Sequence, residues 1–263
     1  MIGWNDVAKT WNSEIGIDGN WFHKSVIYPS ITSIITDIST SSILDIGCGN
    51  GHLCRFLKKT GVEYIVGIDS SENMISECIN QSDNVEYRQM SAENLLFQSD
   101  DFDYCIFNNS LQDIEPYNIA IREAHRVLRS KGKIVAVTRH PCFHPTDDNL
   151  GWYLRSDNTE YMNGKGLTNL LYESNEYSGL YFAMDDYFGN PKHMRSWYGK
   201  VTHSFRRTIQ DYCNAIIKAG FSISSIIEPL PSDEHKGDYP CLHELLTRIP
   251  NFIIFVGEKR SAI

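Results

Sequence analysis

The segment Asp45-Ile46-Gly47-Cys48-Gly49-Asn50-Gly51 has residue types and spacing suited to binding a ligand. A short apolar run precedes it and predicts a β-strand, and helical spacing of apolar residues follows Gly51. Glycine lets the backbone approach a ligand closely, and open α/β folds bind ligands at the carboxyl ends of their strands. The segment therefore predicts a ligand-binding turn between a strand and a helix.

The details of this turn argue against two common phosphate-binding motifs. A dinucleotide fingerprint, G-x-G-x-x-G, would need a glycine six positions into the motif that starts at Gly47, where the chain has His52. A P-loop would need G-K-[ST] after the glycines, and this sequence is absent. The carboxylate of Asp45 would repel a pyrophosphate, whereas it would attract a ligand ammonium group.

Strand and helix patterns alternate on both sides of this turn. Strands are expected over 41–47, 63–69, 84–90, 102–109 and 131–139, and helices over 51–61, 71–81 and 117–130. We expect Gly132 to end the last of these helices. This alternation predicts a mostly parallel sheet with helices on both faces.

The length of the chain, 263 residues, fits one large domain with an insertion. We expect an N-terminal helical cover over 1–40, a ligand-binding core over 41–139, an insertion over 140–206, and a helix with two terminal strands over 207–263. The two strands could pair as an antiparallel edge of the sheet. We expect no particular helix or strand in the polar stretch between them.

The motif Asp45-x-Gly47-x-Gly49-x-Gly51 resembles the first motif of class I S-adenosylmethionine-dependent methyltransferases. The later segments IDSSENM, MSAENLLF, FDYCIFNNSLQDI and HRVLRSKGKIVAV resemble the motifs that follow in that family. The resemblance implies a Rossmann-like fold with a mostly parallel seven-stranded sheet, an antiparallel C-terminal hairpin and a lid insertion. It is similar to the bacterial small-molecule type, which implies S-adenosylmethionine as methyl donor and S-adenosylhomocysteine as product.

The resemblance also implies which residues would contact the cofactor. The glycines would pass beneath its methionine part, Asp69 would accept hydrogen bonds from the ribose hydroxyls, and Met74 would pack on the adenine. The implied cofactor-binding residues are Asp45, Gly47, Gly49, Gly51, Asp69, Ser70, Met74, Ser91, Ala92, Glu93 and Asn108. For Asp69 and Ser70, capping of the next helix is the simpler alternative.

The insertion over 140–206 contains 13 aromatic residues among 67, which is about 19%, whereas aromatic residues make up 12% of the whole chain. Such a segment predicts a packed lid over the acceptor, or alternatively a satellite core that only covers an edge of the sheet. Tyr153, Trp197 and Arg206 are candidate substrate contacts. Trp21 belongs to an N-terminal aromatic group that could fold over the site, with simple packing as the alternative.

Histidines near the end of the fifth strand are the candidate catalytic residues. His140, His144 and, later in the chain, His203 could each serve as a general base or bind the acceptor. His140, Cys142 and His144 alternate, which also allows a metal site, but prolines interrupt the strand and the ligands would be crowded. We therefore expect no metal.

The charge balance of the chain limits its partners. It has 24 Lys and Arg against 33 Asp and Glu, so the formal net charge is −9, which disfavours nucleic acid as the main partner. No apolar run of membrane-spanning length occurs, and the start has no signal-peptide pattern, so we expect a cytoplasmic protein that binds no membrane and keeps its seven cysteines reduced. The favoured function is methyl transfer to a nitrogen, oxygen or carbon atom of a small metabolite. The alternatives are an RNA or protein methyltransferase and a non-catalytic cofactor-binding subunit.

Overall fold

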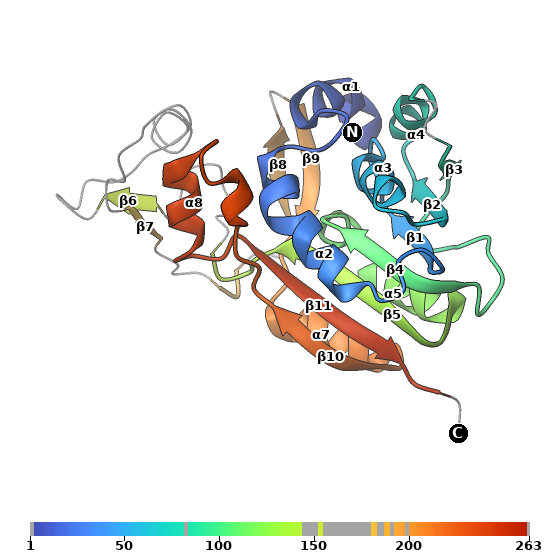
Figure 1. Cartoon of the computed structure of the whole chain (residues 1–263). Helices are drawn as coiled ribbons and strands as arrows, with labels where there is room; N and C mark the ends of the chain where they lie inside the picture. The colour runs from blue at the N-terminus through green and yellow to red at the C-terminus, as the bar shows by residue number, and fades with distance from the viewer. Residues whose placement is uncertain are drawn as a thin grey trace.

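A computed structural model of the chain describes residues 3–81, 84–143, 152–154, 180–182, 187–189, 192–197 and 200–261. Its main feature is one mixed sheet with helices on both faces (Figure 1). Across the sheet the strand order is β10 (Phe221–Ile227), β11 (Phe252–Lys259), β5 (Leu128–Arg139), β4 (Phe102–Asn108), β1 (Ser42–Ile46), β2 (Tyr64–Asp69) and β3 (Glu86–Gln89). The sheet confirms the predicted α/β fold.

The five strands from β5 to β3 run parallel to their neighbours, and β11 is antiparallel to both β5 and β10. The C-terminal strands therefore form the antiparallel edge that the sequence suggested. The chain order reverses at β1, because β2 lies on one side of it and β4 on the other. Open α/β sheets bind ligands at such a reversal, next to the carboxyl ends of the strands.

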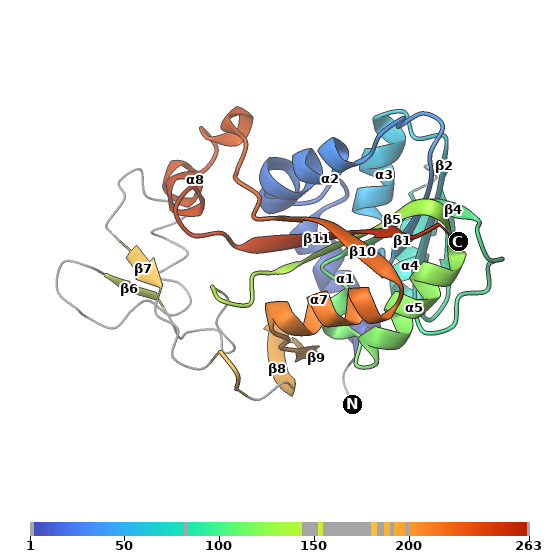
Figure 2. The same ribbon diagram turned by 90° about the horizontal axis from the view of Figure 1, so that it is seen from below.

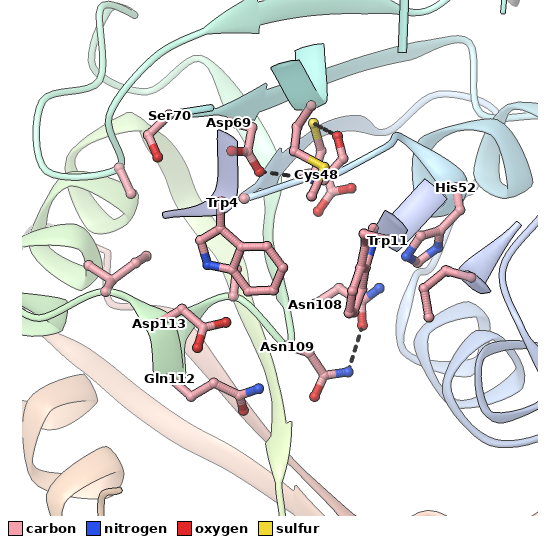
Figure 3. Close-up of a pocket in the computed structure, with 18 of the residues that line it drawn as sticks. Trp4, Trp11, Cys48, His52, Asp69, Ser70, Asn108, Asn109, Gln112 and Asp113 are labelled. Atoms are coloured by element: carbon pink, nitrogen blue, oxygen red, sulfur yellow. Dashed lines mark hydrogen bonds between the residues drawn. The ribbon is translucent and has the colours of Figure 1, made fainter. Parts of the chain in front are cut away.

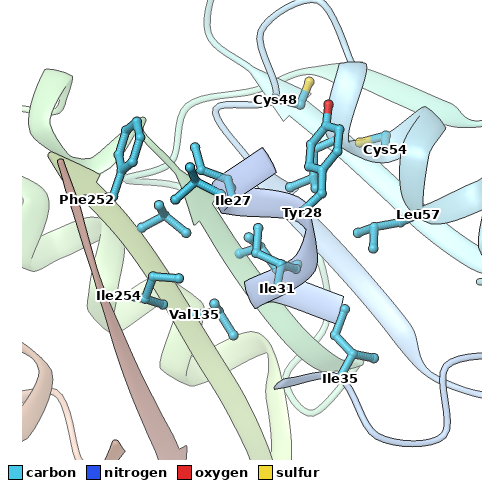
Figure 4. Packing of buried hydrophobic residues seen from close by; sticks show 14 of the residues in the cluster. Ile27, Tyr28, Ile31, Ile35, Cys48, Cys54, Leu57, Val135, Phe252 and Ile254 are labelled. Carbon is cyan, nitrogen blue, oxygen red and sulfur yellow. The ribbon is translucent and has the colours of Figure 1, made fainter. Parts of the chain in front are cut away.

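Helices cover the two faces of the sheet (Figure 2). They are α2 (Tyr28–Ile34), α3 (His52–Lys59) and α4 (Glu72–Ile79), then α5 (Tyr117–Val127) and α7 (Ile209–Lys218). Successive side chains of a strand point to opposite faces, so each buried strand feeds two cores. In β4, Ile106 packs in the core that includes α2 and α3, and Phe107 packs in the core that includes α5 and α7. Figure 4 shows the first core, where Ile31 lies between the sheet and α3.

The N-terminal segment forms α1 (Trp4–Ile15) and a π-helix, η1 (His23–Ile27), which leads into α2. Polar contacts fix α1 on the strand-to-helix turns of the core. Asn12 donates to Glu77 on α4 at 2.7 Å, and Asn50 donates to Asn12 at 2.8 Å. Ser71, the cap of α4, donates to Asn5 at 2.7 Å. The segment is thus helical and lies over the carboxyl ends of β1 and β2.

Within the insertion, the described strands are β6 (Trp152–Leu154), β7 (Leu180–Phe182), β8 (Lys192–Trp197) and β9 (Lys200–Phe205), paired as β6–β7 and β8–β9. Strand β9 packs against α1 and against the 3-10 turn η2 (Leu111–Asp113), which follows β4. The side chains of Tyr153 and Trp197 lie outside the described part of the chain, as does His144. The predicted lid remains an expectation.

One helix boundary differs from the sequence prediction, and one segment contains elements that were not predicted. Helix α5 ends at Val127, and Gly132 lies inside strand β5 instead of ending a helix. Between β10 and β11 the chain forms a 3-10 turn, η4 (Asp233–His235), and a short helix, α8 (Pro240–Leu246), that the polar sequence did not indicate.

Arg207 holds the turn that follows β4. Its guanidinium donates to the carbonyl oxygens of Leu111 at 2.8 Å, Ile114 at 2.5 Å and Glu115 at 3.1 Å. The same group lies 3.9 Å from the ring centroid of Tyr117. The side chain is only 8% exposed, so this one cation fixes the backbone of the whole turn.

We expect Arg207→Met to lower the free energy of unfolding by about 2–4 kcal/mol, because buried carbonyls would lose charge-assisted hydrogen bonds. Urea unfolding gives the stability, and hydrogen exchange of the amides over 111–115 reports the turn itself. Arg206→Met is the control, because Arg206 is the neighbouring and less buried arginine. Equal stability of the two variants would contradict the role assigned to Arg207.

Candidate functional site

A cavity of about 620 Å³ lies at the carboxyl ends of the central strands, beneath α1 (Figure 3). The glycine turn after β1, the end of β2 and the segment after β4 supply one part of its lining. Residues of α1, of η1 and the stretch before it, of α4, of the turn after β3, of the end of β5 and of the start of β11 also line it. The volume is in the range of small-molecule sites.

Backbone hydrogen bonds shape the glycine turn. The N–H groups of Gly47 and Cys48 both donate to the carbonyl oxygen of Ile68 on β2, at 2.8 and 2.9 Å. Gly47, Gly49 and Gly51 all have positive φ, at 75°, 55° and 78°, a conformation that favours glycine. The sequence prediction of a glycine-dependent turn is therefore explained by its backbone.

The three glycines have different surroundings. A Cβ on Gly47 would overlap the side chain of Ser110, and a Cβ on Gly51 would lie 2.6 Å from the hydroxyl of Tyr87. Gly49 faces the open cavity, because its nearest neighbour would be the indole nitrogen of Trp11 at 3.7 Å. Gly47 and Gly49 line the cavity, whereas Gly51 begins α3 outside the lining.

Asp45 lies at the floor of the cavity and is 1% exposed. The thiol of Cys54 donates to its Oδ2 at 3.3 Å, while its Oδ1 is buried without a hydrogen-bond partner. Burial raises the pKa of Asp45 to about 7, against the bond from Cys54, and the nearby charge of Asp69 adds to the rise. A buried carboxylate oxygen with no donor is a favourable place for a cationic donor of a ligand.

Asp69 ends β2 and joins the glycine turn to the next helix. Its Oδ2 accepts the N–H of Gly49 at 3.0 Å and its Oδ1 accepts the N–H of Ser71 at 2.9 Å. Burial raises the pKa of Asp69, and the backbone donors oppose that rise. Each carboxylate oxygen can accept a second bond, so Asp69 can hold its turn and still bind two ligand hydroxyls.

The cavity wall next to Asp69 is formed by residues from the turns after β2 and β3. Ser70 lies at its edge, and Met74 is buried on the first turns of α4. In the turn after β3, Ser91 donates to Glu93 through its hydroxyl. The predicted cofactor-binding residues of this wall that line the cavity are Ser70, Met74, Ser91, Ala92 and Glu93.

Two tryptophans of α1 cover the cavity. The rings of Trp4 and Trp11 meet edge to face, with centroids 5.4 Å apart. In Figure 3, Trp4 lies between Asp69 on one side and Asn109 on the other. These rings exclude water from the space above Gly49.

A pair of buried histidines lies at the end of the cavity next to Trp11. The ring centroids of His23 and His52 are 4.2 Å apart. The Nδ1 of His52 lies 2.8 Å from the hydroxyl of Tyr28, which itself donates to the carbonyl oxygen of Asp18 at 3.1 Å. A hydroxyl has one proton, so His52 must donate through Nδ1. Burial lowers the pKa of His52 well below its usual value and holds the ring neutral.

The sequence indicated neither histidine as a site residue. His52 was noted only as the residue that breaks the dinucleotide motif, and His23 carries no motif. A π-helix, which often marks a functional site, begins at His23, but no sequence pattern predicts one. Arg139, Gln112, Phe22 and Phe252 also line the cavity without having been predicted.

Several predicted residues lie outside the lining. His140 is 2% exposed and its Nε2 lies 2.9 Å from Glu228, while its Nδ1 accepts the N–H of Cys142. Trp21 is buried, and its indole donates to the carbonyl oxygen of His235 at 3.0 Å. The structure does not bring His203 or Arg206 to the cavity either, whereas Asn108 does line it.

Among the described residues, no three His, Cys, Asp or Glu side chains are grouped as a metal site requires. None of the helices in that part of the chain combines the length and the apolar character needed to span a bilayer.

Known methyltransferases resemble this chain in sequence and in fold. Residues 44–136 match a family model described as a methyltransferase domain. The chain is 24% identical to a structure titled S-adenosylmethionine dependent methyltransferase from Mesorhizobium loti, with a TM-score of 0.69, covering 93% of this chain and 100% of that one. A Listeria monocytogenes structure titled putative S-adenosylmethionine dependent methyltransferase gives 24% identity and a TM-score of 0.67, covering 89% and 96%.

Curated relatives match mostly over the core. A demethylmenaquinone methyltransferase of Thermotoga maritima is 26% identical over 48% of this chain and 53% of its own length. A malonyl-[acyl-carrier protein] O-methyltransferase of Hamiltonella defensa is 30% identical over 39% of each chain. An uncharacterized protein of Haemophilus influenzae is 21% identical over 78% of this chain and 77% of its own length. The chain thus spans about two fifths to one half of the length of the two relatives that have an enzyme name.

We expect Asp45→Asn to remove a pH-dependent loss of stability in the free protein. The pKa of Asp45 is raised from 3.8 to about 7, so between these values the unfolded chain binds fewer protons than the folded chain. The free energy of unfolding of the native protein therefore falls as the pH rises through this window, by up to about 4 kcal/mol. Urea unfolding of both proteins across the window tests this, and parallel stability curves would contradict it.

Proposed function

We propose that this chain, a class I S-adenosylmethionine-dependent methyltransferase, transfers the methyl group to a nitrogen, oxygen or carbon atom of a small metabolite. The observation that carries the proposal is the covered cavity itself. Its lining extends from the carboxylates of Asp45 and Asp69 to Arg139 at the end of β5, and it includes Trp4 and Trp11 of α1. A cofactor and a small acceptor can therefore share one cavity.

The residues of the cavity fit S-adenosylmethionine. The unpartnered Oδ1 of Asp45 can accept a bond from the ammonium of its methionine part. Gly49 leaves open space beside the turn, which a side chain at this position would fill. Asp69 keeps acceptor capacity for two ribose hydroxyls while it holds Gly49 and Ser71.

The apolar wall beside Asp69 suits the adenine. Met74, Met90 and Ala92 are nearly fully buried and line the cavity, so they offer it an apolar surface. Methionine side chains adapt well to aromatic rings. Glu93 and Ser91 line the same cavity and supply acceptors that can bind the adenine amino group.

When bound, the cofactor supplies an electrophilic methyl group on a sulfonium, which is already activated for attack. The protein then needs to align the acceptor and exclude water, and alignment can contribute several kcal/mol. Trp4 and Trp11 exclude water from above. Asn108 and Asn109, at the end of β4, lie between the cofactor half and the rest of the cavity and can orient the acceptor.

A small acceptor fits the cavity better than a macromolecule. The cavity contains several carboxylates and is covered by α1, whereas an RNA substrate would require a basic and open surface. Two of the relatives reported above are named demethylmenaquinone methyltransferase and malonyl-[acyl-carrier protein] O-methyltransferase, so the substrate class differs among them.

We expect transfer of label from methyl-labelled S-adenosylmethionine to a low-mass product when the protein is incubated with a fractionated metabolite extract. Mass detection identifies the product. Total RNA and a protein extract from the same cells are the parallel samples. Label in either of these fractions, with none in the metabolites, would contradict the small-molecule assignment. Cofactor binding without any labelled product would support a non-catalytic subunit.

We expect Asp69→Ala to weaken the binding of S-adenosylhomocysteine by about 1.5–3 kcal/mol, the range for losing hydrogen bonds to a charged group. Calorimetry measures the affinity, and a melting curve checks that the variant is folded. Asp103→Ala is the matched control, because Asp103 also accepts a backbone N–H, that of Ser42 at 2.8 Å, but does not line the cavity. An unchanged affinity of the Asp69 variant would reduce Asp69 to a structural cap.

A further inference from the structure

The cavity has a region that the cofactor assignment does not use. Asp69 ends β2, whereas Arg139 ends β5, and β1 and β4 lie between these strands. Adjacent strands are about 4.8 Å apart, so the two strand ends are about 14 Å apart across the sheet. The region next to Arg139 is therefore on the far side of β4 from the ribose-binding carboxylate.

Contacts between several elements build this region. Phe252, at the start of β11, pairs with Arg139 in the sheet register. Phe22 packs edge to face on Phe252, with ring centroids 5.9 Å apart. The side-chain oxygen of Gln112 accepts the backbone N–H of Arg139 at 3.3 Å, which leaves the amide NH₂ of Gln112 as its donor group. All four residues line the cavity.

Arg139 is unusual in its charge. Among the described residues that line the cavity, it is the one arginine or lysine, and the acidic lining residues are Asp45, Asp69, Glu93, Asp113 and Glu115. A guanidinium presents a planar set of donors that matches a carboxylate. The single cation thus marks the one part of the cavity suited to an anionic group.

His23 also lines the cavity, where the charge of Arg139 acts on it. Its Nδ1 lies 3.2 Å from the backbone nitrogen and 2.8 Å from Oδ1 of Asn20, and its role toward each depends on the ring tautomer. Burial, followed by the charges of Arg139 and Lys24, lowers the pKa of His23 to about 3. The ring is therefore neutral, and its Nε2 can form one hydrogen bond with a ligand.

We propose that Phe22, His23, Gln112, Arg139 and Phe252 form an anion subsite that selects a small acceptor with an apolar body and a carboxylate group. The proposal rests on the proposed methyltransferase function and names its substrate class. The guanidinium of Arg139 and the amide of Gln112 bind the carboxylate, and the two phenylalanines hold the apolar body. Nε2 of His23 forms a hydrogen bond with a polar group of the acceptor and so fixes its orientation.

The rival occupant of Arg139 is the carboxylate of the cofactor's own methionine part. The strand order argues against it. The glycine turn after β1 and Asp69 after β2 are the proposed cofactor-binding elements, and they lie on the other side of β4 from β5. The two arrangements make different predictions for the same variant. Loss of Arg139 should change the binding of the acceptor in the first and of the cofactor in the second.

The test uses benzoate and benzamide, which share an apolar ring but differ in charge. Each probe is titrated into the native protein with and without saturating S-adenosylhomocysteine, and binding is followed by NMR line broadening of the probe. We expect benzoate to bind about ten-fold more tightly than benzamide, the factor for one charge-assisted hydrogen bond. Arg139→Gln should abolish this preference, and Arg139→Lys should keep part of it.

The matched control is Arg129→Gln, because Arg129 lies on the same strand at its other end, where it pairs with Asp103. This variant should keep the full preference for benzoate, and all three variants should bind S-adenosylhomocysteine as the native protein does. Equal binding of the two probes, or a preference that survives Arg139→Gln, would overturn the anion subsite. Loss of S-adenosylhomocysteine binding in Arg139→Gln alone would assign the guanidinium to the cofactor. Failure of the native protein to bind S-adenosylhomocysteine would instead refute the proposed function, while the cofactor-free titrations would still measure the subsite.

Discussion

The hydrogen bond from the N–H of Gly49 to the carboxylate of Asp69 is the interaction on which the site depends. It joins the turn after β1 to the end of β2, and the same carboxylate accepts the N–H of Ser71 at the start of α4. One partly buried side chain thus sets the relative position of two turns and a helix. Burial raises the pKa of Asp69 and the backbone donors oppose that rise, so a ligand that adds donors strengthens the same arrangement.

The position of the N-terminal helix α1 is also set by these turns. Asn5 contacts Ser71 and Asn73, and Asn12 contacts Asn50 and Glu77, so α1 is held by polar groups that belong to the ligand-binding turns. The cover over the cavity is therefore fixed by the geometry of the turns beneath it.

The sequence predicted the parts of this structure that are governed by local rules. The strand-helix alternation and the glycine turn with Asp45 and Asp69 are both set by short patterns and appear in the structure. The missed parts depend on contacts between distant segments. His23 becomes a site residue because it packs on His52, and Arg139 because β11 pairs beside it. In contrast, His140 carried a suggestive motif but binds Glu228 away from the cavity. A motif gives the chemistry of a side chain, and only the fold gives its direction.

The charge distribution of the cavity follows the chemistry of the proposed reaction. The carboxylates on the cofactor side favour a cation, and a sulfonium loses its positive charge when its methyl group leaves. In the proposed reaction the site would therefore hold the donor more strongly than the spent product, which would assist release. An anionic acceptor would be repelled by the same carboxylates, so it needs a local cation to enter. Arg139, separated from Asp69 by two strands, supplies that cation without cancelling the negative potential where the sulfonium lies.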